Sequence, residues 1–156
     1  EFGLLEGTGH EEVPARLTAA MPEGIVVHSC YQAQRKLKEL ACVNYIMNCE
    51  YLEDRPQACE PAMRALLGQD SLVARKKSNK AKSGFTEVDL IPLIKSWRLE
   101  CQSDTMTLDM VVSAQNPGLN PELIRAAFCQ TYPQFTPDFV TFHRREVLDG
   151  AGEVFR

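Results

Sequence analysis

Residues 42–52, "CVNYIMNCEYL", decide the fold, because their side chains alternate in character along the chain. Every second residue is mainly apolar: Val43, Tyr45, Met47 and Cys49. The residues between them are mostly polar: Asn44, Ile46 and Asn48. Successive side chains of a strand point to opposite faces of a sheet, so this alternation predicts a strand with one apolar face.

The segments after this strand alternate between helical and extended patterns. The predicted elements are a helix at 58–67, a strand at 71–77, a short extended piece at 85–90, a hairpin with strands at 97–102 and 105–114, a helix at 121–132 and a strand at 139–148. Two successions of strand, helix and strand indicate an α+β protein. We therefore expect a ferredoxin-like βαβ-βαβ sandwich, with helices packed on one face of a mainly antiparallel sheet.

Two polar residues are placed to cap helices. Asn120 precedes the helix at 121–132, and an Asn side chain at that position accepts a hydrogen bond from a free backbone N–H of the first turn. Pro121 suits the first helical position, because its missing N–H would have no partner there. Asp89 is expected in the same way to cap a short helix within "LIPLIKSW", residues 90–97.

The first 40 residues are expected to form a separate strand–helix–strand unit. The patterns predict a short strand at 1–6, a helix at 11–21 that ends at "MPEG", and a β-branched strand at 25–32. The predicted organisation is this unit at 1–40, a ferredoxin-like domain at 41–148 and a flexible tail at 149–156.

The composition is typical of a globular protein without a membrane segment. Of 156 residues, 44% are hydrophobic and 24% are charged, and no apolar run approaches the roughly 20 residues of a membrane helix. Residues 1–12 carry acids and glycines where a signal peptide needs a basic and then an apolar region. We therefore expect a cytoplasmic protein.

The six cysteines do not predict a metal site. No two of them form a CxxC pair, whereas structural zinc sites usually use close pairs of ligands. Four fall in strand-like or helical segments and are expected to be buried as small apolar side chains: Cys42, Cys49, Cys59 and Cys129. In a reducing cytoplasm all six are expected as thiols.

The chain carries no recognisable catalytic motif. It has neither a Walker-type glycine loop nor GxGxxG. His143, within "FHRRE", is a candidate base or ligand, and Asp89 is a second candidate for a polar site. A lone strand histidine is equally consistent with a surface or hydrogen-bonded role. No acid–base pair can be named, so the sequence favours a non-catalytic domain without deciding the question.

The basic segment "ARKKSNKAKSG", residues 74–84, departs most from the average composition. Its five cations are Arg75, Lys76, Lys77, Lys80 and Lys82. The net charge of the chain is −4, and removing these five positive charges leaves −9 for the rest. The segment predicts a local site for phosphate groups or nucleic acid, which Arg144 and Arg145 would extend. The alternatives are a solvated loop and a contact with an acidic protein surface.

Five blocks of the sequence together resemble the radical-SAM-linked family, a bacterial family of unknown function. In order, they are "RLTAAMPEGIVV", "VNYIMNCEYL", "LVARKKSNKAKSGFTEVDLIPLIKSWRLE", "NPGLNPELIRAAF" and "FHRREVL". The third block is the most specific, since the family places lysines ahead of an Asp–hydrophobic–x–Pro–x–Ile sequence. Members of that family occur alone or as the C-terminal domain of large radical SAM proteins.

The resemblance implies an accessory domain that works with a radical SAM protein or domain, in a process related to RNA or the ribosome. It brings no catalytic residues. The cluster motif is absent here, so an iron–sulfur cluster and SAM are expected only on the partner or a fused domain. The family's usual N-terminal half is also absent, which makes the unit at 1–40 resemble the remnant of a truncated first half.

Two functions remain open from the sequence. In the first, the basic segment holds RNA or another phosphorylated substrate. In the second, the domain is a protein-interaction module that docks on the radical SAM partner and has no role with nucleic acid.

Overall fold

The computed structural model describes residues 9–32, 35–53, 56–77 and 83–155. The chain divides into two compact units, Glu1–Leu37 with Arg156, and Lys38–Phe155.

The described residues of the first unit form one α-helix, α1 (Val13–Ala20), with Pro14 in its first turn. The chain leaves the helix at Met21, and the Val27 N–H donates to Thr18 Oγ1 at 3.0 Å. The predicted strand at 25–32 is wrong, because these residues are not in a strand. A strand needs a partner to accept its ladder hydrogen bonds, and the described part of this unit offers none. The strand predicted at 1–6 lies outside the described residues.

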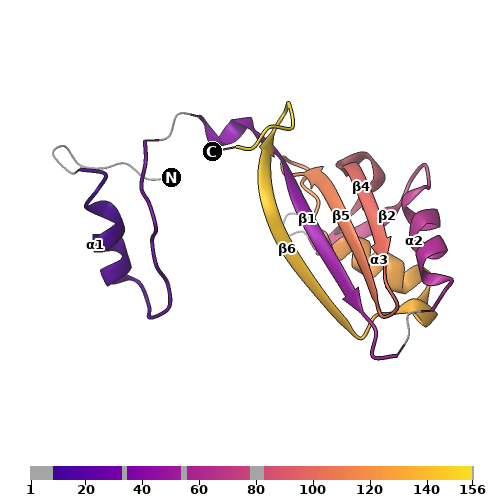
Figure 1. Ribbon diagram of the computed structural model, residues 1–156. Helices are drawn as coiled ribbons and strands as arrows, with labels where there is room; N and C mark the ends of the chain where they lie inside the picture. The colour runs from indigo at the N-terminus through magenta and orange to yellow at the C-terminus, as the bar shows by residue number, and fades with distance from the viewer. Residues whose placement is uncertain (1–8, 33–34, 54–55, 78–82, 156) are drawn as a thin grey trace. The chain divides into compact units, whose positions relative to one another are not determined.

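The second unit is built on a four-stranded antiparallel sheet (Figure 1). Its strands are β1 (Leu40–Glu50), β4 (Ile94–Cys101), β5 (Thr105–Ser113) and β6 (Phe139–Asp149). They lie in the order β4-β5-β1-β6. Helices α2 (Cys59–Leu67) and α3 (Glu122–Thr131) connect them and bury residues in the core under one face. The predicted α+β class is confirmed, and this strand order is that of a ferredoxin-like fold.

The core lies between this sheet face and the two helices. Strand β5 alternates strictly, and its even-numbered residues Met106, Leu108, Met110 and Val112 are at most 1% exposed. From the helices, Met63 and Phe128 are equally buried. Burying this apolar surface is the main favourable term in folding. Strand β1 contributes Met47 and Cys49 from the face that its sequence predicted.

Residues 71–77 do not join the main sheet. Strand β2 (Val73–Lys77) pairs instead with β3 (Phe85–Asp89) in a separate two-stranded antiparallel ribbon, with Arg75 opposite Glu87. Its cations explain the difference, since a strand buried in the sheet would take charged side chains away from water. We call β2 and β3 the basic ribbon.

The predicted helix at 90–97 is also wrong beyond its first turn. A 3₁₀ turn, η2 (Ile91–Leu93), gives way at Ile94 to strand β4. In β4 the side chains of Trp97 and Leu99 lie opposite Met110 and Leu108 of β5. The apolar alternation within β4 therefore overrides the capping signal, because it buries more apolar surface than an exposed helix would.

Three further segments remain: η1 (Leu37–Glu39), which begins at the last residue of the first unit and continues into the second, η3 (Pro133–Phe135) and residues 150–155. The last of these lie within the segment predicted as a flexible tail. They turn back along β6, where the Phe155 N–H donates to Val147 O at 2.8 Å and Val154 bridges Leu148.

No disulfide joins any two of the six cysteines, all of which lie in the described part of the chain. Cys49 and Cys59 are buried as predicted, whereas Cys42 and Cys129 are only half-buried.

Candidate ligand-binding site

The cations of the basic ribbon divide between its two faces. Arg75 and Lys77 are exposed, whereas Lys76 between them is half-buried. The Arg75 guanidinium lies over the Phe85 ring, 5.2 Å from its centroid, which holds this cation on the outer face. Lys80 and Lys82 lie outside the described residues. The ribbon therefore presents two cations outward and one toward the body of the domain.

Lys76 lies at a pocket of about 510 Å3. Its Nζ donates to the carbonyl oxygen of Gly118 at 3.3 Å. The other lining residues come from β1, from the end of β5 and from the turn that leads to α3: Val43, Tyr45, Ser113, Ala114, Leu119 and Asn120. The volume falls in the range of small-molecule sites. None of these lining residues is acidic, so Lys76 gives the pocket a positive charge.

The turn at 114–119 favours a glycine at position 118. A Cβ there would lie 3.1 Å from Gln115 O and 3.2 Å from Ala114 O, closer than side-chain carbons normally approach backbone oxygen. The Leu119 N–H closes the turn on Ser113 O at 2.9 Å. This close turn brings the Gly118 carbonyl within reach of Lys76.

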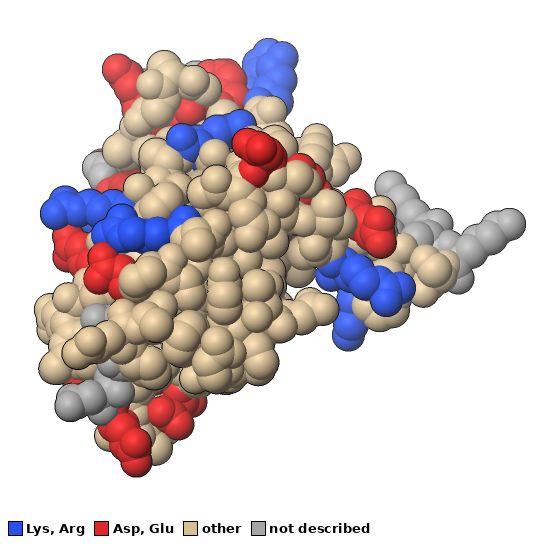
Figure 2. All heavy atoms as spheres, turned by 90° about the vertical axis from the view of Figure 1, so that its right-hand side faces the viewer, with Lys and Arg blue, Asp and Glu red and all other residues tan. Residues whose placement is uncertain are grey.

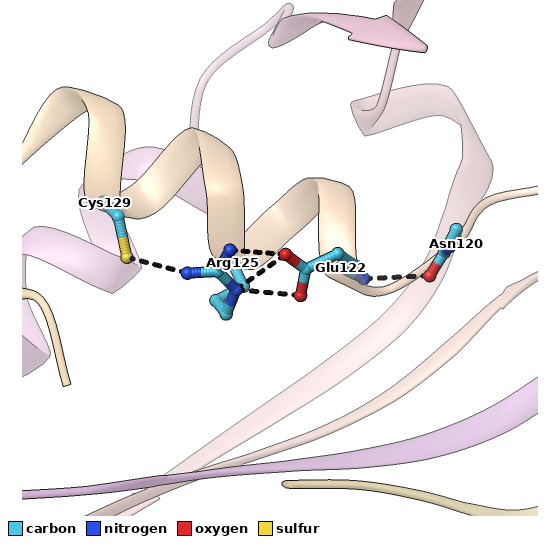
Figure 3. A network of polar contacts seen from close by, with 4 residues as sticks. All are labelled: Asn120, Glu122, Arg125 and Cys129. Carbon is cyan, nitrogen blue, oxygen red and sulfur yellow. Dashed lines mark hydrogen bonds and ion pairs between the residues drawn. The ribbon is translucent and has the colours of Figure 1, made fainter. Parts of the chain in front are cut away.

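Asn120 caps α3 at the pocket, as its position predicted (Figure 3). Its Oδ1 accepts a hydrogen bond from the Glu122 N–H at 3.1 Å. The Glu122 carboxylate binds the Arg125 guanidinium, whose Nη1 donates to Cys129 Sγ at 3.7 Å. The ion pair raises the pKa of Arg125. Because the Asn120 oxygen is occupied by the cap, its Nδ2 group is what it offers to a ligand.

Arg144 and Arg145 lie on opposite faces of the sheet. Arg144 is opposite Tyr45 in the register of β1 and β6, so the two side chains share the face that bears the pocket. A register shift follows at this point, and Arg145 Nη1 lies 3.5 Å from Asp109 Oδ2 on the other face. Only Arg144 can therefore extend the positive surface at the pocket.

Asp89 and His143 lie on different sheets. Asp89 Oδ1 accepts hydrogen bonds from the N–H groups of Leu72 (2.9 Å) and Ile91 (3.2 Å). The Leu72 N–H, with help from the Ser71 side chain and the Ile91 N–H, lowers the pKa of this carboxyl. Asp89 thus ties both strands of the ribbon, at its base, to the 3₁₀ turn. His143 is exposed on β6, opposite Ile46.

The face of the sheet away from the helices is polar. Asn44 Nδ2 donates to Asp109 Oδ1 at 2.6 Å, and Thr107 Oγ1 donates to Asn48 Oδ1 at 3.0 Å. Phe139, at one end of β6, and His143 are the aromatic residues that the described strand registers place on this face. On the surface that Figure 2 presents, cations and anions are interspersed.

Buried titratable groups stay protonated at neutral pH. Burial, with nearby thiols, raises the pKa of Cys49 to about 12. Burial also raises the pKa of Tyr51, whose hydroxyl lies 3.0 Å from Cys59 Sγ and donates to Phe135 O at 3.1 Å. These side chains hold α2 and η3 against the sheet. Among the described residues, no group of three or more His, Cys, Asp or Glu side chains could hold a metal ion.

Sequence comparison places the chain in a family. Residues 1–121 match the model of DUF2344, an uncharacterized protein conserved in bacteria. The chain belongs to this family. All residues that line the pocket at Lys76 fall within the matched segment. No curated protein and no solved structure is significantly similar to the chain.

The family description gives no reaction, ligand or partner, so association with radical SAM proteins stays a prediction. In the described part of the chain, every helix is too short or too polar to span a membrane.

Proposed function

We propose that this domain is a non-catalytic accessory domain that holds RNA, or another phosphorylated substrate, at the basic ribbon and the adjoining pocket. One observation carries the proposal: Lys76 belongs to the ribbon and also lines the pocket, where it contacts Gly118 O. A phosphate chain that follows Arg75 and Lys77 would therefore reach a pocket with a cation of its own.

The chemistry of the pocket supports an anionic ligand. Lys76 keeps donor capacity beyond its single bond to Gly118, and Asn120 offers its amide N–H groups. None of the described lining residues carries a carboxylate that would oppose a phosphate. Charge-assisted hydrogen bonds of this kind are stronger than those between neutral groups.

The ribbon face suits RNA better than the polar face of the sheet does. Sheets that read single-stranded RNA stack two or three bases on aromatic side chains. The polar face here has Phe139 at one end and His143 as its aromatic residues in register, and the Asp109 carboxylate lies near its middle. By contrast, the ribbon and the pocket each place a cation near an aromatic ring: Arg75 lies over Phe85 on the ribbon, and Lys76 lines the pocket together with Tyr45.

The sequence blocks that resemble the radical-SAM-linked family support a place for the domain beside a radical SAM protein or domain in the cytoplasm. In this proposal the partner or fused domain holds the iron–sulfur cluster and SAM. The present domain presents the substrate to it.

Salt-dependent binding to single-stranded RNA and to tRNA tests the RNA proposal. In Arg75→Gln/Lys77→Gln we expect weaker binding and a smaller salt slope, by about 0.7 for each phosphate of a single strand that the variant no longer neutralises. A matched control, Lys95→Gln/Arg98→Gln, removes the same charge from β4. The proposal fails if both double variants bind like the original protein, or if both weaken binding equally.

A second candidate function, a protein-interaction module, is favoured by the polar face of the sheet. That face carries paired charges such as Asp109 with Arg145 and Arg98 with Glu100, a mixture suited to a protein surface of complementary charge. A pull-down with the radical SAM partner tests it. Retention in Arg75→Gln/Lys77→Gln, together with loss in Asp109→Lys, would favour docking over RNA binding.

A further inference from the structure

We infer that the pocket at Lys76 holds one unstacked nucleotide unit, with its base against Tyr45 and its phosphate at the Lys76 ammonium group. This inference rests on the proposed function and names the part of the RNA that the pocket takes. It separates two roles on one ribbon: Arg75 and Lys77 follow the phosphate chain, and Lys76 receives a single nucleotide.

Tyr45 supplies the surface for a base. Its ring is half-buried, packs against the core and lines the pocket beside Val43 and Ala114. In the described part of the chain its hydroxyl has no protein hydrogen-bond partner, and it is reached by solvent, so it is open to a ligand. A nucleotide would provide both a flat face for the ring and acceptors for the hydroxyl.

The polar groups are arranged for a nucleotide and not for a bare phosphate. Lys76 comes from one wall of the pocket and Asn120 from the turn before α3, while Tyr45, Val43 and Leu119 supply the apolar part of a lining that is polar and apolar in similar measure. A volume of about 510 Å3 exceeds what one phosphate group needs. Sites for organic ligands combine apolar surface with placed polar groups, and this lining supplies both.

The alternation of the ribbon explains how both roles occur together. Neighbouring residues of a strand face opposite ways, so a strand of RNA along the outer cations Arg75 and Lys77 lies on the other side of β2 from Lys76. One nucleotide turned past the ribbon edge would reach the pocket. Single-stranded RNA is commonly bound with its bases splayed out onto aromatic side chains.

The test compares nucleoside 5′-monophosphates with ribose 5-phosphate, which lacks the base, by calorimetry on the full chain. We expect the monophosphates to bind more tightly than ribose 5-phosphate. In Tyr45→Leu, affinity for the monophosphates should fall on the order of tenfold or more, as for loss of a base–aromatic stack. Lys76→Gln should weaken both ligands, and Lys95→Gln should weaken neither. Tyr45→Phe keeps the aromatic ring, so it should retain most of the affinity for the monophosphates. It is the conservative control for Tyr45→Leu, in which a loss of affinity could also come from misfolding.

The remaining outcomes would overturn either the nucleotide pocket or the proposed RNA-binding function. Equal affinity for ribose 5-phosphate and the monophosphates, or unchanged binding in Tyr45→Leu, overturns the nucleotide pocket. If RNA binding still depends on Arg75 and Lys77 in that case, the proposed function stands alone. If monophosphates bind through Tyr45 and Lys76 but RNA does not bind the ribbon, the pocket stands and the RNA function fails.

Discussion

The four-stranded sheet and the basic ribbon use the same kind of backbone pairing for opposite purposes. In β5 every second side chain is buried, and the strand is paired on both sides. In β2 no side chain is buried, and the strand has a single partner. A two-stranded ribbon is marginally stable by itself. The sheet therefore supplies most of the stability of the domain. The ribbon is held to it by Ala74 and Val88, which pack against the core, and by a few polar bonds.

Those bonds come from two side chains of the ribbon. Asp89 ties the base of the ribbon to Leu72 and Ile91, and Lys76 ties its side to Gly118. We therefore expect mutations in the core of the sheet to destabilise the whole domain. Mutations of Asp89 or Lys76 should loosen only the ribbon.

The largest effect is expected from Phe128→Ala, on the sheet side of the comparison. Phe128 is 1% exposed and packs in the core under the sheet. Its truncation leaves a cavity, and the free energy of unfolding should fall by about 3–5 kcal/mol. Urea denaturation measures this change. A fall well under about 1 kcal/mol would mean that α3 does not help to close the core.

A smaller effect is expected from Tyr51→Phe. The variant keeps the ring but removes the hydroxyl that donates to Phe135 O and lies beside Cys59 Sγ. Leaving a carbonyl group without its donor should lower the free energy of unfolding by about 1–2 kcal/mol. The same denaturation experiment applies, with Tyr31→Phe as the exposed control. Equal effects in the two variants would contradict the structural role of Tyr51.

Acid should loosen the ribbon before it unfolds the sheet. The pKa of Asp89 lies below its ordinary 3.8 in the folded protein, because the ionised carboxylate accepts backbone N–H bonds. Its contribution is therefore present above about pH 4 and is lost as the pH falls through the lower folded value. Hydrogen exchange of the Leu72 and Ile91 amides, measured against pH and corrected for intrinsic rates, should show this loss of protection.

Asp89→Asn provides the control for the acid experiment, because an amide can still accept these bonds but does not titrate in this range. The pH dependence of protection at Leu72 and Ile91 should disappear in the variant. If the pH dependence persists in the variant, another carboxylate causes it, and Asp89 is not the group that holds the ribbon.

The smallest effect on stability is expected from Lys76→Met, which keeps a long side chain but removes the bond to Gly118 O. The free energy of global unfolding should fall by about 1 kcal/mol or less. Hydrogen exchange should quicken in β2 and β3, and in β5 it should change by no more than this small fall in global stability allows. If β5 responds equally, the ribbon and the sheet form one cooperative unit, and their separate roles are wrong.

Local pattern predicted most of the sheet and little of the ribbon. The alternation in β1 and β5 is visible in the sequence because one face of each strand is buried. The helix α3 and its cap at Asn120 were also predicted. By contrast, the sequence of β2 predicts an extended segment but does not predict the strand with which it pairs. At 25–32, β-branched residues suggested a strand that lacks a partner within the described part of its unit.

The site could be predicted only in part for the same reason. The basic segment predicted Lys76, but its neighbours in space, Tyr45 and Gly118, are far from it in sequence. Tyr45 carries a weak signal, since it places a hydroxyl on the otherwise apolar face of β1. Arg144 and Arg145 looked equivalent in the sequence, and the register shift in β6 sends them to opposite faces.

The pocket at Lys76 has walls from three distant parts of the chain, around positions 43–45, 76 and 113–120. Unfolding would separate these walls, so a ligand that needs all of them binds only the folded domain. Ligand concentration then acts on stability through mass action, by about 2.7 kcal/mol at a hundredfold excess over Kd. A rise in Tm could therefore reveal ligands of this domain in a screen that assumes no activity.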